Sequence, residues 1–139
     1  MTLSHKIRPD LGPFLDELVK MPDGRFAVLL SADGLMTACS AGVPRDEADR
    51  IAAMASGIQS LSQQGGVFVN PGGSSWHQTM VSYKDGYLFI IAAAEGAILI
   101  AAAGANVDVG NFGHQMILLV RRLGESGTVE PRNSPTDRA

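Results

Sequence analysis

Two kinds of hydrophobic spacing alternate along the chain, one typical of amphipathic helices and one of β-strands. Apolar residues at helical spacing, about 3.6 residues apart, predict three helices over the ranges 10–20, 45–64 and 109–123. Short apolar runs bounded by turn residues predict five strands over the ranges 25–32, 35–40, 76–83, 87–94 and 97–103. The expected order of elements is therefore α-β-β-α-β-β-β-α.

Tight turns between the predicted strands indicate how they pair. Asp-Gly or Glu-Gly pairs stand at positions 33–34, 85–86 and 95–96, and two-residue turns of this kind join antiparallel neighbours. Strands such as 25–32 are apolar on both faces, so both faces of the sheet must be covered. We predict an α/β fold with a five-stranded, mainly antiparallel sheet between helices.

The second predicted helix has two neighbouring stripes that allow more than one interpretation. Large apolar residues, Ile51, Met54, Ile58 and Leu61, share one face and are the expected core contact. Beside them lies a flank of small or uncharged residues: Ala48, Ala52, Gln59 and Gln63. This flank either lets a second helix approach closely or is simply exposed to solvent.

The segment between this helix and the third strand is rich in glycine. Val67-Phe68-Val69 predicts the start of a strand, and residues 70–75 predict a loop. A glycine-rich loop can cradle phosphate, but this one lacks a lysine and precedes a strand, so an ordinary loop is favoured.

Composition and charge narrow the classes of function. With 139 residues and 45% apolar residues, the chain is expected to be one domain with its own core. A net charge of −3 disfavours a nucleic-acid partner. The single cysteine excludes an internal disulfide and is typical of a reducing, cytoplasmic location. The apolar run 87–103 is interrupted at Glu95-Gly96, so no membrane insertion is expected.

No catalytic or cofactor-binding motif stands out. The P-loop signature is missing, and the three histidines lack metal-ligand spacing, so we expect no metal and no cofactor. Ser75, His77 and Asp85 can be written as a triad, but no nucleophile elbow accompanies them. The chain is therefore not expected to be an enzyme.

Four segments carry a resemblance to a known family: FAVLLSADGL at 26–35, PRDEADRIAAMASG at 44–57, VDVGNFGHQM at 107–116 and LVRRLG at 119–124. They resemble the bacterial roadblock/LC7 family, most closely the roadblock protein of the conservon operons. The resemblance covers residues 9–124, which we interpret as the domain. Residues 1–8 are then a flexible N-terminus and residues 125–139 a disordered tail.

The resemblance implies a fold and a mode of self-association. Roadblock domains place two helices on one face of the sheet and one on the other. They form homodimers through their second helices and third strands, giving a continuous ten-stranded sheet. In this sequence the small flank and the third strand would supply those contacts. The candidate dimer-interface residues are Ala48, Ala52, Ala55, Gln59, His77, Thr79 and Val81.

The resemblance also implies partners. Conservon roadblock proteins are encoded beside a Ras-like small GTPase and a histidine-kinase-like membrane protein, which could bring the chain to the membrane. Relatives in the gliding-motility system activate their GTPase without an arginine finger, by positioning the partner's residues. The candidate GTPase contacts are Arg45, Asp49, Arg50, Ala53 and Ser56. The alternative is a stand-alone sensory or ligand-binding module of PAS or GAF type, which would need an apolar cavity.

Overall fold

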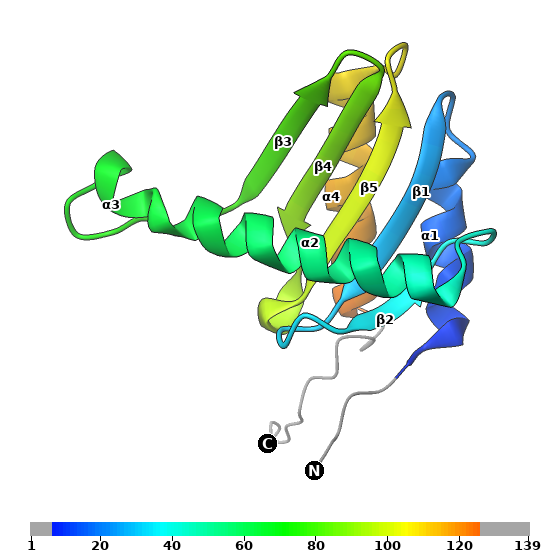
Figure 1. The fold of residues 1–139 in the computed structure, drawn as a ribbon, viewed down its shortest axis with the longest axis horizontal. Helices are drawn as coiled ribbons and strands as arrows, with labels where there is room; N and C mark the ends of the chain where they lie inside the picture. Colours follow the sequence, from blue (N-terminus) through cyan, green and yellow to red (C-terminus); the bar gives the residue numbers. More distant parts are fainter. Residues whose placement is uncertain (1–6, 126–139) are drawn as a thin grey trace.

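A five-stranded antiparallel sheet forms the middle layer of the molecule (Figure 1). The structure is a computed structural model, and it describes residues 7–125. The strands lie in the order β2-β1-β5-β4-β3. Their bounds are Gly24–Leu30 for β1, Met36–Cys39 for β2, Gln78–Tyr83 for β3, Gly86–Ala92 for β4 and Ile98–Gly104 for β5. The prediction of five antiparallel strands is confirmed, and β2 and β3 are the two edges.

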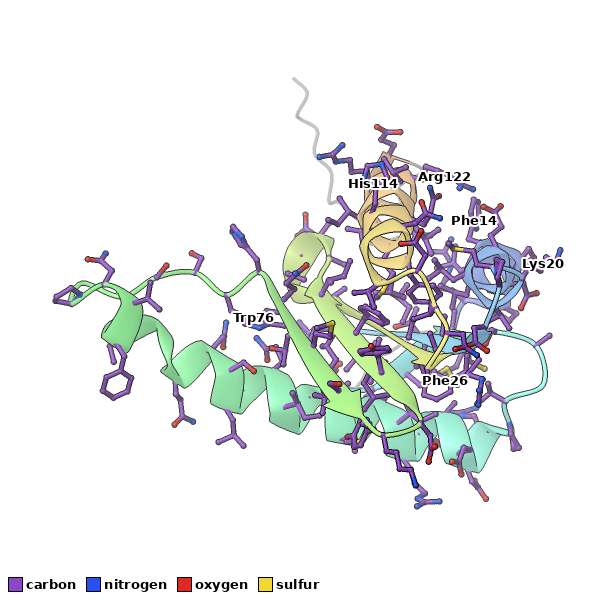
Figure 2. All side chains as sticks on the ribbon, turned by 90° about the horizontal axis from the view of Figure 1, so that it is seen from above. Phe14, Lys20, Phe26, Trp76, His114 and Arg122 are labelled. Carbon is purple, nitrogen blue, oxygen red and sulfur yellow. The ribbon has the colours of Figure 1, made fainter. Side chains whose placement is uncertain are left out.

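Two helices cover one face of this sheet, as the view from above shows (Figure 2). They are α1, Gly12–Val19, preceded by the short helix η1, Pro9–Leu11, and α4, Val109–Glu125. The apolar stripe of α1 packs mainly on β1 and β2 and that of α4 on β4, where the Phe89 and Phe112 ring centroids lie 5.0 Å apart. Asp108 caps the start of α4, because its Oδ1 accepts a hydrogen bond from the Asn111 N–H at 3.1 Å.

One long helix crosses the opposite face. It is α2, Arg45–Gln64, and a single further turn, α3, Gly66–Val69, follows it. Beneath α2 lies a second core cluster in which Val28, Ile90 and Ile100 are fully buried. The sheet therefore has helices on both faces, two on one and α2 with α3 on the other, as the resemblance described above implies.

The connections differ from the sequence prediction in two places. The turn at Glu95-Gly96 is one turn of 3-10 helix, η2, Ala94–Gly96, with Glu95 at φ 59°. The segment Val67-Phe68-Val69 is helical, as α3, and does not begin a strand. The prediction of a strand there is wrong, and β3 begins only at Gln78.

Most of the two predicted terminal segments, 1–8 and 125–139, lies outside the described residues. Within residues 7–125, no helix combines the length and the apolar character that crossing a membrane requires.

Candidate interaction surface

The outer edge of β3 is open along residues 78–83. Within residues 7–125, β3 pairs only with β4. The Ala92 N–H donates to the His77 carbonyl at 3.0 Å, and hydrogen-bonded pairs alternate along an antiparallel ladder. Residues 79, 81 and 83 therefore bond to β4, whereas Gln78, Met80 and Ser82 turn their N–H and C=O groups outward. These outward groups form an edge that a further strand can pair with.

The core-facing side of α2 consists of its small residues. Ala48, Ala52 and Ala55 are 0%, 1% and 0% exposed, and they pack on the sheet with Ile51. These three alanines therefore belong to this chain's own core and are not free to contact a second helix. Gln59, one turn beyond Ala55, is half-buried on the same side. The prediction that this flank is a helix–helix contact surface is corrected: close approach to the sheet, not to another helix, requires small side chains here.

Larger apolar residues lie instead on an exposed side of α2. Met54 and Leu61 are 41% and 70% exposed, and Ile58 between them is half-buried. Their spacing of i, i+4 and i+7 places them on one side of the helix, next to the core-facing side. We call Met54, Ile58 and Leu61 the apolar flank. It is the apolar part of α2 that remains exposed to another chain.

The predicted GTPase contacts lie on α2, where all of them are exposed except Ser56, which is half-buried. Arg45, Asp49, Ala53 and Ser56, spaced by three or four residues, form a polar flank on the side away from the apolar flank. Arg45 Nε lies 3.4 Å from Asp49, and the Arg50 guanidinium lies 3.1 Å from Glu47. Both ion pairs are largely exposed and within one helix, so they hold their side chains only weakly.

The three predicted contacts around β3 are placed differently from one another. His77 is exposed and precedes the strand, whereas Thr79 and Val81 are half-buried on the face that α2 covers. The Trp76 indole N–H donates to Thr79 Oγ1 at 2.8 Å, and that hydroxyl donates to Ser62 Oγ at 2.7 Å. This chain of hydrogen bonds fixes the end of α2 to the start of β3.

The exposure of the apolar residues of α3 was not recognised in the sequence, although Phe68 and Val69 are the most exposed large apolar residues in the part of the chain that the structure describes. In α3, Val67, Phe68 and Val69 are 53%, 89% and 79% exposed. A Val-Phe-Val run is typical of a buried strand, so its pattern gave no warning of exposure. Gly66 is the one local sign that this segment is not an ordinary strand. A Cβ there would collide with the backbone of Ser74, so the returning loop needs a glycine at this position.

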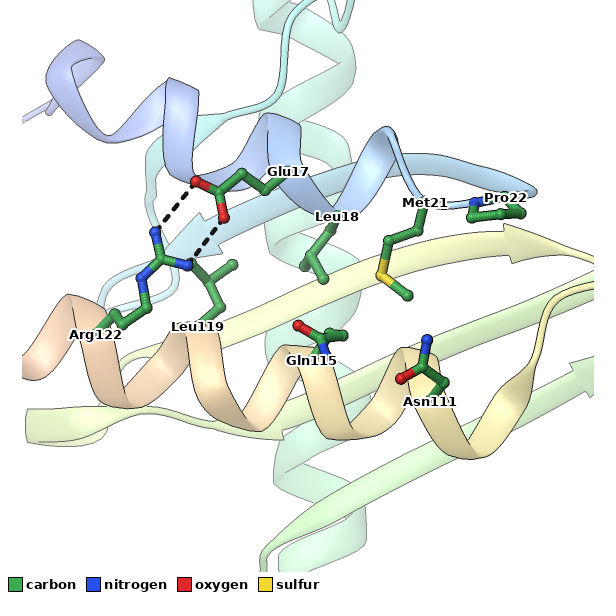
Figure 3. Close-up of a pocket in the computed structure, with 8 residues that line it drawn as sticks. All are labelled: Glu17, Leu18, Met21, Pro22, Asn111, Gln115, Leu119 and Arg122. Atoms are coloured by element: carbon green, nitrogen blue, oxygen red, sulfur yellow. Dashed lines mark hydrogen bonds and ion pairs between the residues drawn. The ribbon is translucent and has the colours of Figure 1, made fainter.

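On the far face, α1 and α4 border a shallow groove that contains none of the predicted site residues (Figure 3). Leu18 and Leu119 are among the residues that line it. At one end the Arg122 guanidinium donates two hydrogen bonds to the Glu17 carboxylate, at 2.9 and 3.1 Å, which lowers the pKa of Glu17 below its ordinary value. Arg122 also lies 5.4 Å above the Phe14 ring. The pair joins the two helices across the groove.

The triad written from the sequence is not assembled. Ser75 and His77 precede β3 and Asp85 follows it, so the length of a six-residue strand, about 20 Å, separates them. The chemistry that the described surface offers is therefore hydrogen bonding at a strand edge, apolar contact and weakly paired charge.

Comparison with known proteins identifies the family and agrees with the fold. The family model "Roadblock/LC7 domain" matches residues 13–103. The chain belongs to the roadblock/LC7 family. A roadblock/LC7 domain from Streptomyces avermitilis is 34% identical, with a TM-score of 0.76, over 84% of this chain and 96% of that one.

Two structures of MglB share the fold at lower identity. MglB from Myxococcus xanthus is 10% identical, with a TM-score of 0.73, over 84% of this chain and 93% of that one. A structure described as MglB with a tetrameric arrangement is 16% identical, with a TM-score of 0.70, over 81% and 84% of the two chains. A search of curated protein sequences gave no match.

Proposed function

We propose that this roadblock domain is a non-catalytic homodimeric regulator or scaffold that binds a Ras-like small GTPase in bacterial signalling. The observation that carries the proposal is the open edge of β3 beside the exposed apolar flank of α2. A strand edge and an apolar surface side by side are the two features that a second protein chain must cover.

The occupant we propose for the β3 edge is a second copy of the chain. The outward groups of Gln78, Met80 and Ser82 can pair with the same groups of a copy related by a twofold axis, because an antiparallel pair of identical strands is self-complementary. The same rotation brings the apolar flanks of the two α2 helices to one side of the joined sheet. This interface replaces the alanine-lined one expected from the sequence.

The GTPase would bind the polar flank of α2, Arg45, Asp49, Ala53 and Ser56, together with Arg50. The charged side chains there are exposed and held only by weak pairs, so a partner can rearrange them at little cost. The class of partner, a Ras-like small GTPase, comes from the family resemblance. A histidine-kinase-like membrane protein as a second partner stays a prediction. With no catalytic group in the described site, stimulation of GTP hydrolysis would act by ordering the partner's own residues.

The sensory alternative has less support. A ligand-binding module keeps an apolar cavity in its core, but the central strand β5 carries Leu99, Ile100 and Ala101 at 0% exposure, packed directly against the helices. The packed sheet therefore favours a protein-binding domain over a sensory or ligand-binding module.

Two measurements test the proposal. Light scattering of the purified chain should give twice the mass of 14.6 kDa. The Ras-like GTPase encoded nearest to the chain, loaded with GDP or with a non-hydrolysable GTP analogue, should be captured by the immobilised chain. The variant Arg45→Glu/Arg50→Glu should lower that capture at least tenfold while leaving the dimer mass unchanged. Equal capture by the wild type and the variant would show that the GTPase does not bind the polar flank.

GTP hydrolysis measured with and without the chain separates an activator from a scaffold. A higher rate identifies a GTPase activator, and firm binding with an unchanged rate identifies a scaffold. Failure to capture the GTPase in either nucleotide state would contradict the proposed function.

A further inference from the structure

We propose that the GTPase contact continues from the polar flank of α2 onto the adjoining end of the sheet, where Glu95 receives a lysine or arginine of the GTPase. This inference rests on the proposed function and deepens it. It adds an acidic contact residue, on a turn between two strands, to a surface that otherwise consists of one helix.

The polar flank faces sideways from α2, towards one end of the sheet. Ser56, the last residue of this flank, is half-buried against the β1–β2 turn, since a Cβ on Gly34 would lie 3.1 Å from Ser56 Oγ. The Gly34 N–H donates to the Ser31 carbonyl, and the Ser31 N–H donates to the Leu35 carbonyl, both at 2.9 Å, which fixes the shape of this turn. A protein that covers the polar flank therefore meets the β1–β2 turn next.

The turn between β4 and β5, η2, lies beside the β1–β2 turn (Figure 1). A Cβ on Gly96 would lie 3.0 Å from the Cβ of Ala32, so the two turns are in contact across the end of the sheet. Ser56, residues 31–35 and residues 94–96 thus form one continuous surface, which we call the rim.

The size of a protein interface brings the rim within reach of the GTPase. A stable interface covers about 800 Å² on each partner, a patch roughly 30 Å across. From Arg45 to Ser56 the polar flank extends only about 16 Å at the rise of an α-helix. A patch of ordinary size centred on this flank therefore passes its end and includes the rim.

Glu95 has a backbone conformation that suits other residue types better. The Ala97 N–H donates to the Ala94 carbonyl at 3.0 Å, and Glu95 and Gly96 between them have φ of 59° and 80°. These are the angles of a type I′ turn, in which asparagine, aspartate or glycine fits best at the first central position. The fold alone would favour one of those residues over a glutamate.

The other non-glycine residue with positive φ within residues 7–125 has a structural reason for its place. Asp23, at φ 69°, accepts a hydrogen bond from the Asn106 N–H on its carboxylate and one from the Gly104 N–H on its carbonyl, both at 2.8 Å. The Glu95 carboxylate is exposed, and no residue in the described range forms a hydrogen bond or ion pair with it. A strained backbone whose side chain does nothing for the fold is typical of a functional position.

The charge of Glu95 sets the chemistry of the contact. The carboxylate of Asp33, also on the rim, is already engaged by the Ser31 hydroxyl. Glu95 is therefore the rim carboxylate that can accept a charge-assisted hydrogen bond from a lysine or arginine of the GTPase. Because the partner also excludes water from the rim, this pair contributes more than the exposed ion pairs within α2.

Substitution of Glu95 tests the contact in the full chain. Glu95→Asn suits the turn and removes the charge, so we expect a higher urea midpoint, an unchanged dimer mass and a GTPase capture lower by about fivefold or more. Glu95→Lys places like charges together and should lower the capture further, by about twentyfold or more. Capture is measured in the nucleotide state that the wild type captures best.

The matched control is Asp85→Asn, an exposed acidic residue in the β3–β4 turn at the opposite end of the sheet, and it should leave capture unchanged. Equal capture by the wild type and Glu95→Asn would overturn the inference and leave the proposed function standing. An equal loss in Asp85→Asn would also overturn it, because net charge would then explain the effect, and so would a lower urea midpoint in Glu95→Asn. A wild-type chain that captures no GTPase would contradict the proposed function and this inference with it.

Discussion

The two edges of the sheet are finished in different ways. At β2, the chain covers its own short edge: the Arg8 N–H donates to the Thr37 carbonyl at 2.7 Å, and η1 packs alongside. At β3, six residues long, no described residue pairs with the outward groups of Gln78, Met80 and Ser82. Edges that stay open invite pairing, so native proteins cover or interrupt them. The comparison indicates that the β2 edge is covered within one copy, whereas the β3 edge is open to a partner.

The largest expected effect is on the stability of a single copy, in the core beneath α2. Ala52 is 1% exposed against the sheet, so Ala52→Arg forces a cation and its volume into a packed core. We expect it to destabilise the folded chain by about 3 kcal/mol or more. Urea unfolding followed by circular dichroism measures this loss.

The matched control is Ala53→Arg, one residue away on the exposed side of the same helix. Its effect should stay within about 0.5 kcal/mol, as for ordinary surface changes. If Ala52→Arg instead gave a stable monomer, Ala52 would face a partner and the described packing of α2 would be wrong.

This pair of variants also shows what the sequence could and could not predict. Helical periodicity located α2, and turn pairs located the strands, because both signals are local. The core-facing side of α2 was misassigned, because the large residues Met54 and Leu61 and the small residues Ala48 and Ala52 lie on adjoining sides. Which side meets the sheet depends on how closely the helix approaches it, and that is a tertiary property.

The same limit explains the error at α3. Val67, Phe68 and Val69 favour a strand locally, but the segment is one helical turn, and the backbone of Ser74 lies so close to Gly66 that only a glycine fits there. The β3 edge could be foreseen as a strand without a second neighbour. Its outward register could not, because register depends on pairing with β4.

The next largest effect should fall on the open side. Met80 has an outward N–H, so Met80→Pro removes a donor from the outer edge and none from the ladder to β4, and proline is tolerated at such edge positions. We expect the chain to stay folded while the dimer dissociation constant rises at least a hundredfold, as measured by sedimentation of a dilution series. Met80→Leu is the control and should still dimerise. An undisturbed dimer in the proline variant would place the interface elsewhere.

A smaller effect is expected where the two sides meet. Thr79→Val keeps the shape of the side chain but removes its hydrogen bonds to Trp76 and Ser62. Because the Trp76 indole N–H then loses its acceptor, we expect a loss of about 1 kcal/mol in urea unfolding. Ser62→Ala removes only one of the two bonds and should cost less. Equal stability of the wild type and Thr79→Val would mean that solvent replaces these bonds fully.

The smallest effect concerns the ion pair on the far face, which belongs to the complete part of the molecule. Two hydrogen bonds from Arg122 lower the pKa of Glu17, so the folded state favours the charged carboxylate. The stabilisation is thus present above the ordinary glutamate pKa of about 4.3 and is lost as the pH falls through the lowered value.

Because both side chains are about half exposed, Glu17→Gln should cost only about 0.5 kcal/mol at pH 7. In urea unfolding at a series of pH values, the difference from the wild type should shrink below about pH 4. A difference that persists in acid would assign it to packing, and a changed dimer mass would show that the far face also takes part in association.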